Sequence, residues 1–309
     1  MTGTIEHTAT LVHFGDDSFA YAGHHHHPAS HPVHTHSFIE MAVVHAGDGV
    51  HHSLAGRQRL RPGDVVLLRP GVWHGYEDCH DLDLYNCCFS ADLLRNELAW
   101  TRDDPLLGGL LWTGPYEAGG RGMLTTRLPP DDFAECVGHL DDLSRLRERS
   151  PALHRGDLIA RLTLALGCVA RTLPSAGTAR PEQGHPAVTE ATRWMEERPA
   201  HPWTLNELAG ALHLAPGYLV RLFKSVTGLP PMAYLTRHRA ELAADRLLHT
   251  DEQVNAIGES VGWADPNYFA RRFRAHFGLS ASAYRTRFRG NAMRLGAWPG
   301  RPITQRRPG

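Results

Sequence analysis

Residues 254–289 read VNAIGESVGWADPNYFARRFRAHFGLSASAYRTRFR, and residues 205–239 read LNELAGALHLAPGYLVRLFKSVTGLPPMAYLTRHR. The two segments are copies of one pattern with a period of about fifty residues. Their apolar positions match in order, from Leu205 with Val254 to Tyr234 with Tyr284, once one extra residue in the second copy is allowed for. A repeat of this kind predicts two copies of a single supersecondary unit.

Each copy reads as two short helices joined by a tight turn. His213 in the first copy and Gly262 in the second lie where the chain must turn, and such a turn favours a positive φ angle. Gly228 and Gly278 are expected to end the second helix of each copy. This layout predicts two helix-turn-helix units in an all-α domain over residues 187–289.

The second helix of each copy, expected at 216–226 and 266–276, separates into an apolar inner face and an outward stripe. Asn and Arg can read base edges in the major groove, and Lys and Arg can hold phosphates. A solvated helix face would explain one such stripe, but its recurrence in a repeat favours DNA binding. The residues expected to contact DNA are Gly217, Val220, Arg221, Lys224, Asn267, Tyr268, Ala270, Arg271 and Arg274.

A long helix is expected between the two copies, over residues 232–250. Leu235, Leu242, Leu247 and Leu248 can pack on both units. A rigid helix here would hold the two reading helices about one DNA turn apart, ~34 Å. The two helices could then enter successive major grooves on one face of a duplex.

The C-terminal segments resemble the AraC/XylS family of transcription regulators. The resemblance rests on YLVRLFKSVTGLPPMAYLTRHR and AIGESVGWADPNYFARRFRAHFGLSASAYRTRFR and on their spacing. It implies a seven-helix DNA-binding domain with two helix-turn-helix units, and regulation in response to a signal. Val220 and Ala270 are apolar at outward positions that are often polar in this family, which argues against direct hydrogen-bond readout there and leaves contact with a thymine methyl group as the alternative.

The charge of the chain is distributed unevenly. The net charge of −1 divides into 15 basic and 23 acidic residues over 1–185, and 17 basic and 10 acidic residues over 186–309. A basic half after an acidic half is typical of a DNA-binding domain attached to another domain. No apolar run is long enough for a membrane span, and no signal-peptide pattern is visible, so a cytoplasmic protein is expected.

The N-terminal part reads as β structure. Over residues 31–100, short apolar runs alternate with turn signals such as HAGDG and RPGD, which predicts a small barrel or sandwich. The whole chain is therefore expected to be α+β. The expected domains are a β-barrel at 1–130, a helical hairpin for dimerisation at 131–173, a linker at 174–186, the DNA-binding domain at 187–289 and a disordered basic tail at 290–309.

A constellation of histidines lies in the predicted barrel. HTHSFIEMAVVHAG supplies His34, His36 and Glu40, and RPGDVVLLRPGVWH supplies His74. These segments resemble the two sequence motifs of the cupin barrel. Two histidines at i and i+2 on a strand point to one face, and three imidazoles with a carboxylate suit Zn, Fe(II), Mn or Ni. The four residues are expected either to line an effector pocket or to bind a divalent metal.

The sequence indicates no functional role for the other histidines of the N-terminal part. The run His24 to His27 is expected to form a solvated loop with adventitious metal affinity, and His51 and His52 are expected on a hairpin.

Two functions of different classes follow. The first is a regulator that binds double-stranded DNA as a homodimer under control of a small-molecule effector, with RNA polymerase as a further partner if it activates. DLYNCCFS at 83–90 and the general layout resemble sugar-responsive members, which makes a carbohydrate the expected effector. The second is a metal-dependent cupin enzyme, such as a dioxygenase or isomerase, with structural C-terminal helices.

Overall fold

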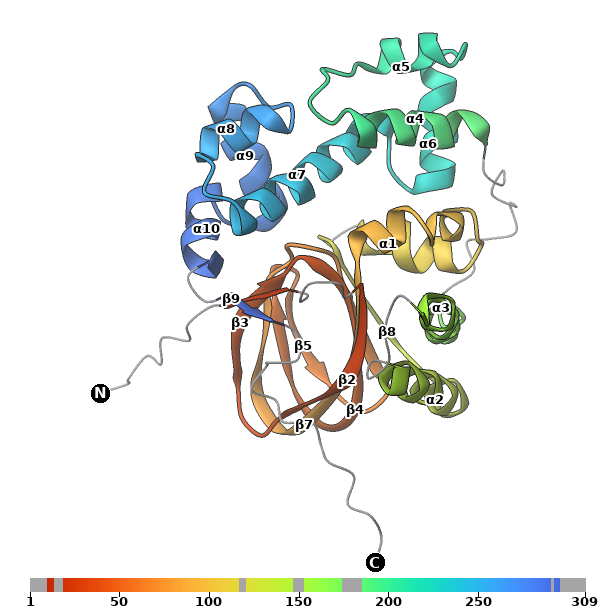
Figure 1. Cartoon of the computed structure of the whole chain (residues 1–309), viewed down its shortest axis with the longest axis vertical. Helices are drawn as coiled ribbons and strands as arrows, with labels where there is room; N and C mark the ends of the chain where they lie inside the picture. The colour runs from red at the N-terminus through yellow and green to blue at the C-terminus, as the bar shows by residue number, and fades with distance from the viewer. Residues whose placement is uncertain are drawn as a thin grey trace, which may run out of the picture.

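The computed structural model describes residues 10–13, 19–116, 121–146, 153–173, 185–289 and 292–294. A sheet-rich N-terminal domain flanked by helices precedes an all-helical C-terminal domain (Figure 1), so the predicted α+β class is confirmed. Within the described residues, no helix has both the length and the apolar composition that crossing a bilayer requires.

The strands of the N-terminal domain and β9, which follows the last helix, form one strongly curved sheet (Figure 1). They are β1 Thr10–His13, β2 Ala20–His27, β3 His31–His36, β4 Phe38–Ser53, β5 Gly56–Leu60, β6 Asp64–Leu68, β7 His74–Ser90, β8 Met123–Arg127 and β9 Ala292–Arg294. The hydrogen-bonded order is β8-β6-β4-β7-β3-β1-β9, with β2 added to β7 and β5 to β4. No pairing of β9 with β8 is present among the described strands, so the expected barrel is an open curved sheet.

The two long strands β4 and β7 organise this domain, because their side chains alternate between the two faces of the sheet. On one face, Ile39, Met41 and Phe89 join a core with α2 Pro130–Leu146 and α3 Arg155–Ala170. On the other face, Val44 and Leu84 belong to a separate inner core. The helical hairpin therefore covers the outer face of the sheet and leaves the inner face to the interior of the domain (Figure 1).

Short helical segments lie between β7 and β8. They are α1 Ala91–Arg95, η1 Ala99–Arg102, η2 Gly109–Thr113 and η3 Gly114–Tyr116. Leu93, Leu110 and Trp112 from these segments are buried in the same core as the hairpin.

Two expectations from the sequence are wrong, one for the run His24 to His27 and one for part of the C-terminal tail. His24 to His27 do not form a solvated loop: they lie in β2, where each pairs with a residue of β7 and His25 and His27 are buried. In the tail expected to be disordered, residues 292–294 form β9, which pairs in parallel with β1. The remainder of that tail, and residues 174–184 of the expected linker, lie outside the described residues.

The C-terminal domain contains the seven helices that the family resemblance implies. They are α4 Pro186–Glu197, α5 Leu205–Ala211, α6 Pro216–Thr227, α7 Pro231–His249, α8 Val254–Ser260, α9 Pro266–Phe277 and α10 Ala281–Arg289. Helix α7 runs between the group α4–α6 and the group α8–α10 (Figure 1). Its first half supplies Tyr234 and Leu235 to one core, and its second half supplies Leu247 and Leu248 to the other.

The predicted backbone of both units is confirmed. His213 has φ 56° and Gly262 has φ 90°, as expected for the turn between the helices of each unit. Gly228 and Gly278 end α6 and α9 in the left-handed conformation, at φ 75° and 74°. Both second helices have Pro in their first turn, where its missing N–H costs no hydrogen bond.

Candidate functional site

The first reading helix, α6, presents the stripe expected from the sequence. Its inner face buries Leu219, Leu222, Phe223 and Val226 in the core of the first unit. Gly217, Arg221 and Lys224 are exposed on the opposite side, and Val220 is half-buried beside them. The apolar face therefore fixes the orientation of the helix, and the stripe faces solvent.

The second reading helix, α9, is arranged in the same way. Phe269, Phe273 and Phe277 are buried in the second core. The exposed side carries Asn267, Ala270, Arg271 and Arg274. Tyr268 is half-buried, and its hydroxyl accepts a hydrogen bond of 2.9 Å from Nε of Arg272. Tyr268 thus lies at the margin of the stripe and organises a neighbouring arginine.

The electrostatics of the two helices suit a polyanion. Arg221, Lys224, Arg271 and Arg274 are exposed, and none forms an ion pair with a carboxylate among the described residues. Arg193 on α4 is the contrasting case, because it pairs with Glu190 and Glu197 on its own helix. Unpaired exposed cations on two matched helices can neutralise phosphates without first breaking an internal ion pair.

The inner face of the sheet gathers the four residues expected to form the second site. His34, His36, Glu40 and His74 are all buried, and we call them the interior cluster. Ligand atoms of His34, Glu40 and His74 lie within 4.8 Å of one another. Nε2 of His36 lies 3.1 Å from Oε2 of Glu40, and Nε2 of His74 lies 3.9 Å from the same oxygen. The carboxylate is therefore the common neighbour of two imidazoles.

The contact between His36 and Glu40 needs a positive charge. Nδ1 of His36 donates to the backbone oxygen of Phe38 at 2.8 Å. In the neutral ring this tautomer leaves a lone pair on Nε2, which then faces a carboxylate oxygen. A proton or a cation between the two atoms makes this contact favourable.

Three buried imidazoles of the inner face, those of His34, His51 and His74, favour their neutral, ligand-competent form. Burial, together with neighbouring histidines, holds the pKa of His34 and of His74 well below the ordinary value. Burial, with a smaller contribution from His52, also lowers the pKa of His51 to about 3. A neutral imidazole offers one lone pair and one N–H, so this surface can bind a metal ion or a polar molecule.

His51, which the sequence left without a role, lies beside the interior cluster. Its ring centroid is 5.5 Å from that of His74 and 5.5 Å from that of Tyr76. Within the described residues, neither ring nitrogen of His51 has a hydrogen-bond partner, and the hydroxyl of Tyr76 has none. Leaving such groups unpaired costs about 1–3 kcal/mol each, so a polar ligand or water is expected to complete them.

The interior cluster lies next to the C-terminal domain. Thr35 stands between His34 and His36 on β3, and its hydroxyl is 3.2 Å from that of Tyr284 in α10. The Tyr284 hydroxyl donates to the backbone oxygen of Gly71 at 3.0 Å. Trp73, which precedes His74, donates from Nε1 to the backbone oxygen of Phe277 at 3.1 Å. Residues that alternate with the cluster therefore contact the second helix-turn-helix unit.

A buried polar group also joins the domains, and no sequence pattern predicted it. Arg69, after β6, donates from Nε to the hydroxyl of Tyr116 at 2.9 Å and lies 3.4 Å from Glu241 of α7. The Tyr116 hydroxyl donates to Glu241, and Arg237 stacks on the Tyr116 ring at 4.2 Å. These residues are far apart in sequence and share no motif, so only the tertiary structure brings them together.

Comparison with known proteins agrees with both halves of this description. The AraC-like ligand binding domain family matches residues 17–113, and the Helix-turn-helix domain family matches residues 208–287. The RCS-specific HTH-type transcriptional activator RclR of Escherichia coli (strain K12) is 35% identical over 244 residues, covering 74% of this chain and 78% of that protein. The HTH-type transcriptional activator RhaS of Escherichia fergusonii is 28% identical over 253 residues, covering 81% and 85%.

Among solved structures, ToxT from Vibrio cholerae superposes with a TM-score of 0.50 at 12% identity, covering 87% of this chain and 98% of that one. At this identity the match concerns the fold, and it extends over both domains.

Proposed function

The chain belongs to the AraC family of transcription regulators, and we propose that it binds an asymmetric operator through α6 and α9 under the control of a polar effector held on the inner face of the sheet. Its DNA-binding and ligand-binding domains are those of the family. The proposal for the operator rests on the matched stripes of exposed, unpaired cations. The stripe of α9 carries Asn267 and two arginines, whereas that of α6 has one arginine and one lysine, so the two half-sites should differ in sequence.

A mobility-shift assay on promoter DNA tests the DNA-binding surface. We expect sequence-specific binding that weakens steeply with salt, because each neutralised phosphate contributes a slope of about −0.9 to the plot of log affinity against log salt. Genome-wide mapping of the bound DNA would supply the operator. Affinity independent of salt would contradict the proposed role of the exposed cations.

The effector is proposed to be a small molecule rich in hydroxyl groups, of the carbohydrate class. The support is the set of buried polar atoms without a partner on His51 and Tyr76, beside the neutral imidazoles of His34 and His74. Hydroxyl groups donate and accept, so a sugar can satisfy all of them. A thermal-shift screen should find stabilisation by sugars that is lost in His51→Phe. Stabilisation by aromatic acids alone would reject the carbohydrate class.

The interior cluster also has the donor set for a divalent metal ion. Neutral imidazoles and a carboxylate within 4.8 Å fit Zn²⁺ or Fe²⁺, and a cation would resolve the contact of Nε2 of His36 with Glu40. His34, Glu40 and His74 would hold the ion, with His36 beside them, and the ion would supply a Lewis-acid contact for a hydroxyl of the effector. The relatives are transcriptional activators, and we propose a regulator without turnover. Stoichiometric iron together with turnover would instead support the enzyme alternative.

We propose that the effector changes DNA binding through residues that alternate along the strand with those of the interior cluster, or that precede them, and that contact the C-terminal domain. On β3, His34 and His36 face the cluster and Thr35 contacts Tyr284; before β7, Trp73 contacts the C-terminal end of α9. A shift of these strands on ligand binding would displace α10 and α9 directly.

The remaining partners are also proposals. We propose that the α2–α3 hairpin mediates a homodimer, since Leu153 and Leu164 are exposed at 82% and 47%. Light scattering of wild type and Leu164→Glu tests this, and an unchanged mass would contradict it.

We propose that the protein acts in the cytoplasm, where its DNA lies, and contacts RNA polymerase as an activator.

A further inference from the structure

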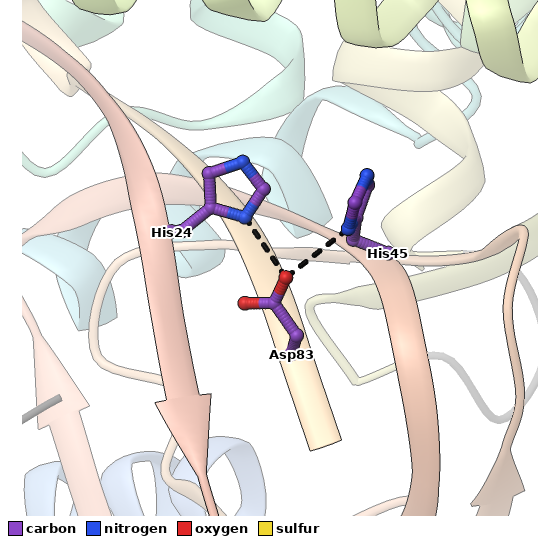
Figure 2. A group of neighbouring side chains, drawn as sticks. All are labelled: His24, His45 and Asp83. Carbon is purple, nitrogen blue, oxygen red and sulfur yellow. Dashed lines mark hydrogen bonds and ion pairs between the residues drawn. The ribbon is translucent and has the colours of Figure 1, made fainter. Parts of the chain in front are cut away.

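Three side chains from three strands meet on the outer face of the sheet, apart from the interior cluster. They are His24 of β2, His45 of β4 and Asp83 of β7, and we call them the rim triad (Figure 2). Nδ1 of His24 lies 3.0 Å from Oδ2 of Asp83, and Nδ1 of His45 lies 3.1 Å from the same oxygen. The ring of His24 packs on Tyr85, and that of His45 stacks on Phe133 of α2.

An irregularity of the sheet creates this arrangement. In the pairing of β4 with β7, Val44 is opposite Leu84 and Ala46 is opposite Asp83, so His45 is the extra residue of a bulge. A bulge redirects a side chain that regular alternation would place elsewhere. Here it brings the imidazole of His45 beside Asp83, and the regular β2–β7 register brings His24 to the other side.

The burial of the three side chains is graded. The Asp83 side chain is only 5% exposed, whereas those of His24 and His45 are 26% and 38% exposed. Oδ2 of Asp83 accepts from both rings, but Oδ1 is buried and has no hydrogen-bond partner among the described residues. The two imidazole rings are thus accessible to solvent, whereas the carboxylate that they contact is buried.

The Asp83 carboxylate lies in a place where burial makes an anion unfavourable. Burial alone would raise the pKa of Asp83, but hydrogen bonds from His24 and His45 outweigh it and hold that pKa well below its usual range. A buried anion with one unsatisfied oxygen is costly unless a cation is close. Two imidazoles and a carboxylate are the ligands that Zn²⁺, Cu²⁺ and Ni²⁺ prefer.

We propose that the rim triad binds one divalent transition-metal ion of this class, with water completing its coordination. The ligands would be Nδ1 of His24, Nδ1 of His45 and the Asp83 carboxylate. To bind the ion, each ring would be neutral and would carry its proton on Nε2 in place of Nδ1, and Nε2 points away from Asp83 in both rings (Figure 2). Donor separations of 3.0 and 3.1 Å are close to the ~3.4 Å between ligands of a tetrahedral site with bonds of ~2.0–2.1 Å. The ion would join β2, β4 and β7 beside α2.

Titration of the untagged, full-length protein with Zn²⁺ tests the proposal, with Co²⁺ absorption as a spectroscopic probe of the ligands. We expect His45→Gln and Asp83→Asn each to weaken one site at least ~100-fold, since even outer-shell partners contribute 10–100-fold. His45 is the most exposed of the three, so His45→Gln should keep the fold. Thermal unfolding without metal verifies this.

His26→Gln is the matched control. His26 lies on β2, the strand that also carries His24, and its side chain is about one-third exposed. Its Nε2 lies 3.8 Å from Oδ1 of Asp81, so the ring is directed away from the rim triad. It should leave the Zn²⁺ affinity of the rim site unchanged. An equal loss of Zn²⁺ affinity in His26→Gln would overturn the proposal and would indicate adventitious binding by the run His24 to His27. The proposal would also be overturned if no Zn²⁺ site lost affinity in His45→Gln. An ion in the interior cluster would survive His45→Gln and be lost in Glu40→Gln.

Discussion

At the level of single residues, α6 and α9 are distinguished by exposed cations that have no carboxylate partner in the described part of the chain. Arg221 and Arg271 hold equivalent places in the repeat, each one turn after the start of its stripe, and both are exposed. Their long side chains and forked donors suit either a guanine edge or a phosphate. If α6 and α9 bind the operator as we propose, each arginine is expected to read its own half-site.

The double substitution Arg221→Ala and Arg271→Ala should abolish sequence-specific DNA binding. Loss of a base contact costs about 1–3 kcal/mol per arginine, which amounts to a loss of ~10² or more in affinity for the pair. Footprinting on the mapped operator measures the effect.

Arg193→Ala is the control for this experiment, because Arg193 lies on α4 and is already paired with Glu190 and Glu197. It should bind the operator like wild type. A double variant with a wild-type footprint would show that these helices are not the reading helices.

At the level of elements, the ends of α6 and α9 serve two purposes. Gly228 and Gly278 terminate the helices in the left-handed conformation, and both lie against the N-terminal domain. A Cβ at Gly228 would be 2.7 Å from Thr113, and one at Gly278 would be 2.6 Å from Leu54. The helix caps are therefore also contact points between the domains.

Gly228→Ala and Gly278→Ala should each lower the free energy of unfolding by about 1–2 kcal/mol from the backbone alone, with a further loss from the contact with the other domain. Thermal unfolding measures this. Gly210→Ala is the matched control: Gly210 lies in α5, and beyond its chain neighbours and its own helix backbone no described atom lies within 4 Å of its Cβ position, so the change should stabilise by ~0.5–1 kcal/mol. Unchanged stability in Gly228→Ala would refute the double role of the cap.

The elements also show what the sequence can and cannot predict. The helix-turn-helix units were predictable because their pattern is local: the apolar spacing, the turn at His213 and Gly262, and the glycine caps all act within a few residues. In the sheet, the places of His51 beside the interior cluster and of Asp83 in the rim triad were not predicted. The bulges between Val44 and Val50 change the alternation of β4 and its register with β7, so inward and outward positions cannot be counted from the motif at His34.

At the level of the whole molecule, a buried charge joins the two domains. Burial would raise the pKa of Glu241, but the charges of Arg69 and Arg237 and the hydrogen bond from Tyr116 lower it to about 2, from an ordinary value of 4.5. The folded state thus favours the ionised carboxylate. Its contribution to stability is complete above about pH 4.5 and is lost as the pH falls towards 2.

We expect Glu241→Gln to be less stable than wild type at pH 7 by on the order of 3 kcal/mol. The difference in free energy of unfolding should shrink as the pH falls from about 4.5 towards 2, because the unfolded chain takes up a proton at Glu241 before the folded protein does. Glu252→Gln, an exposed residue 3.6 Å from Arg246, should differ from wild type by less than ~1 kcal/mol throughout. A gap between wild type and Glu241→Gln that does not change with pH would contradict this account.

Helix α7 has a further consequence, because it belongs to both cores of the C-terminal domain. Each half of α7 packs in the core of one unit, so the orientation of α9 relative to α6 depends on the length of α7. One inserted residue would rotate the second unit by ~100° and advance it by ~1.5 Å, which would point α9 away from the groove. Two full turns, about seven residues, would restore the phase but add ~10 Å. The permitted spacings between half-sites should therefore change in discrete jumps during evolution, with no variants at the intermediate lengths.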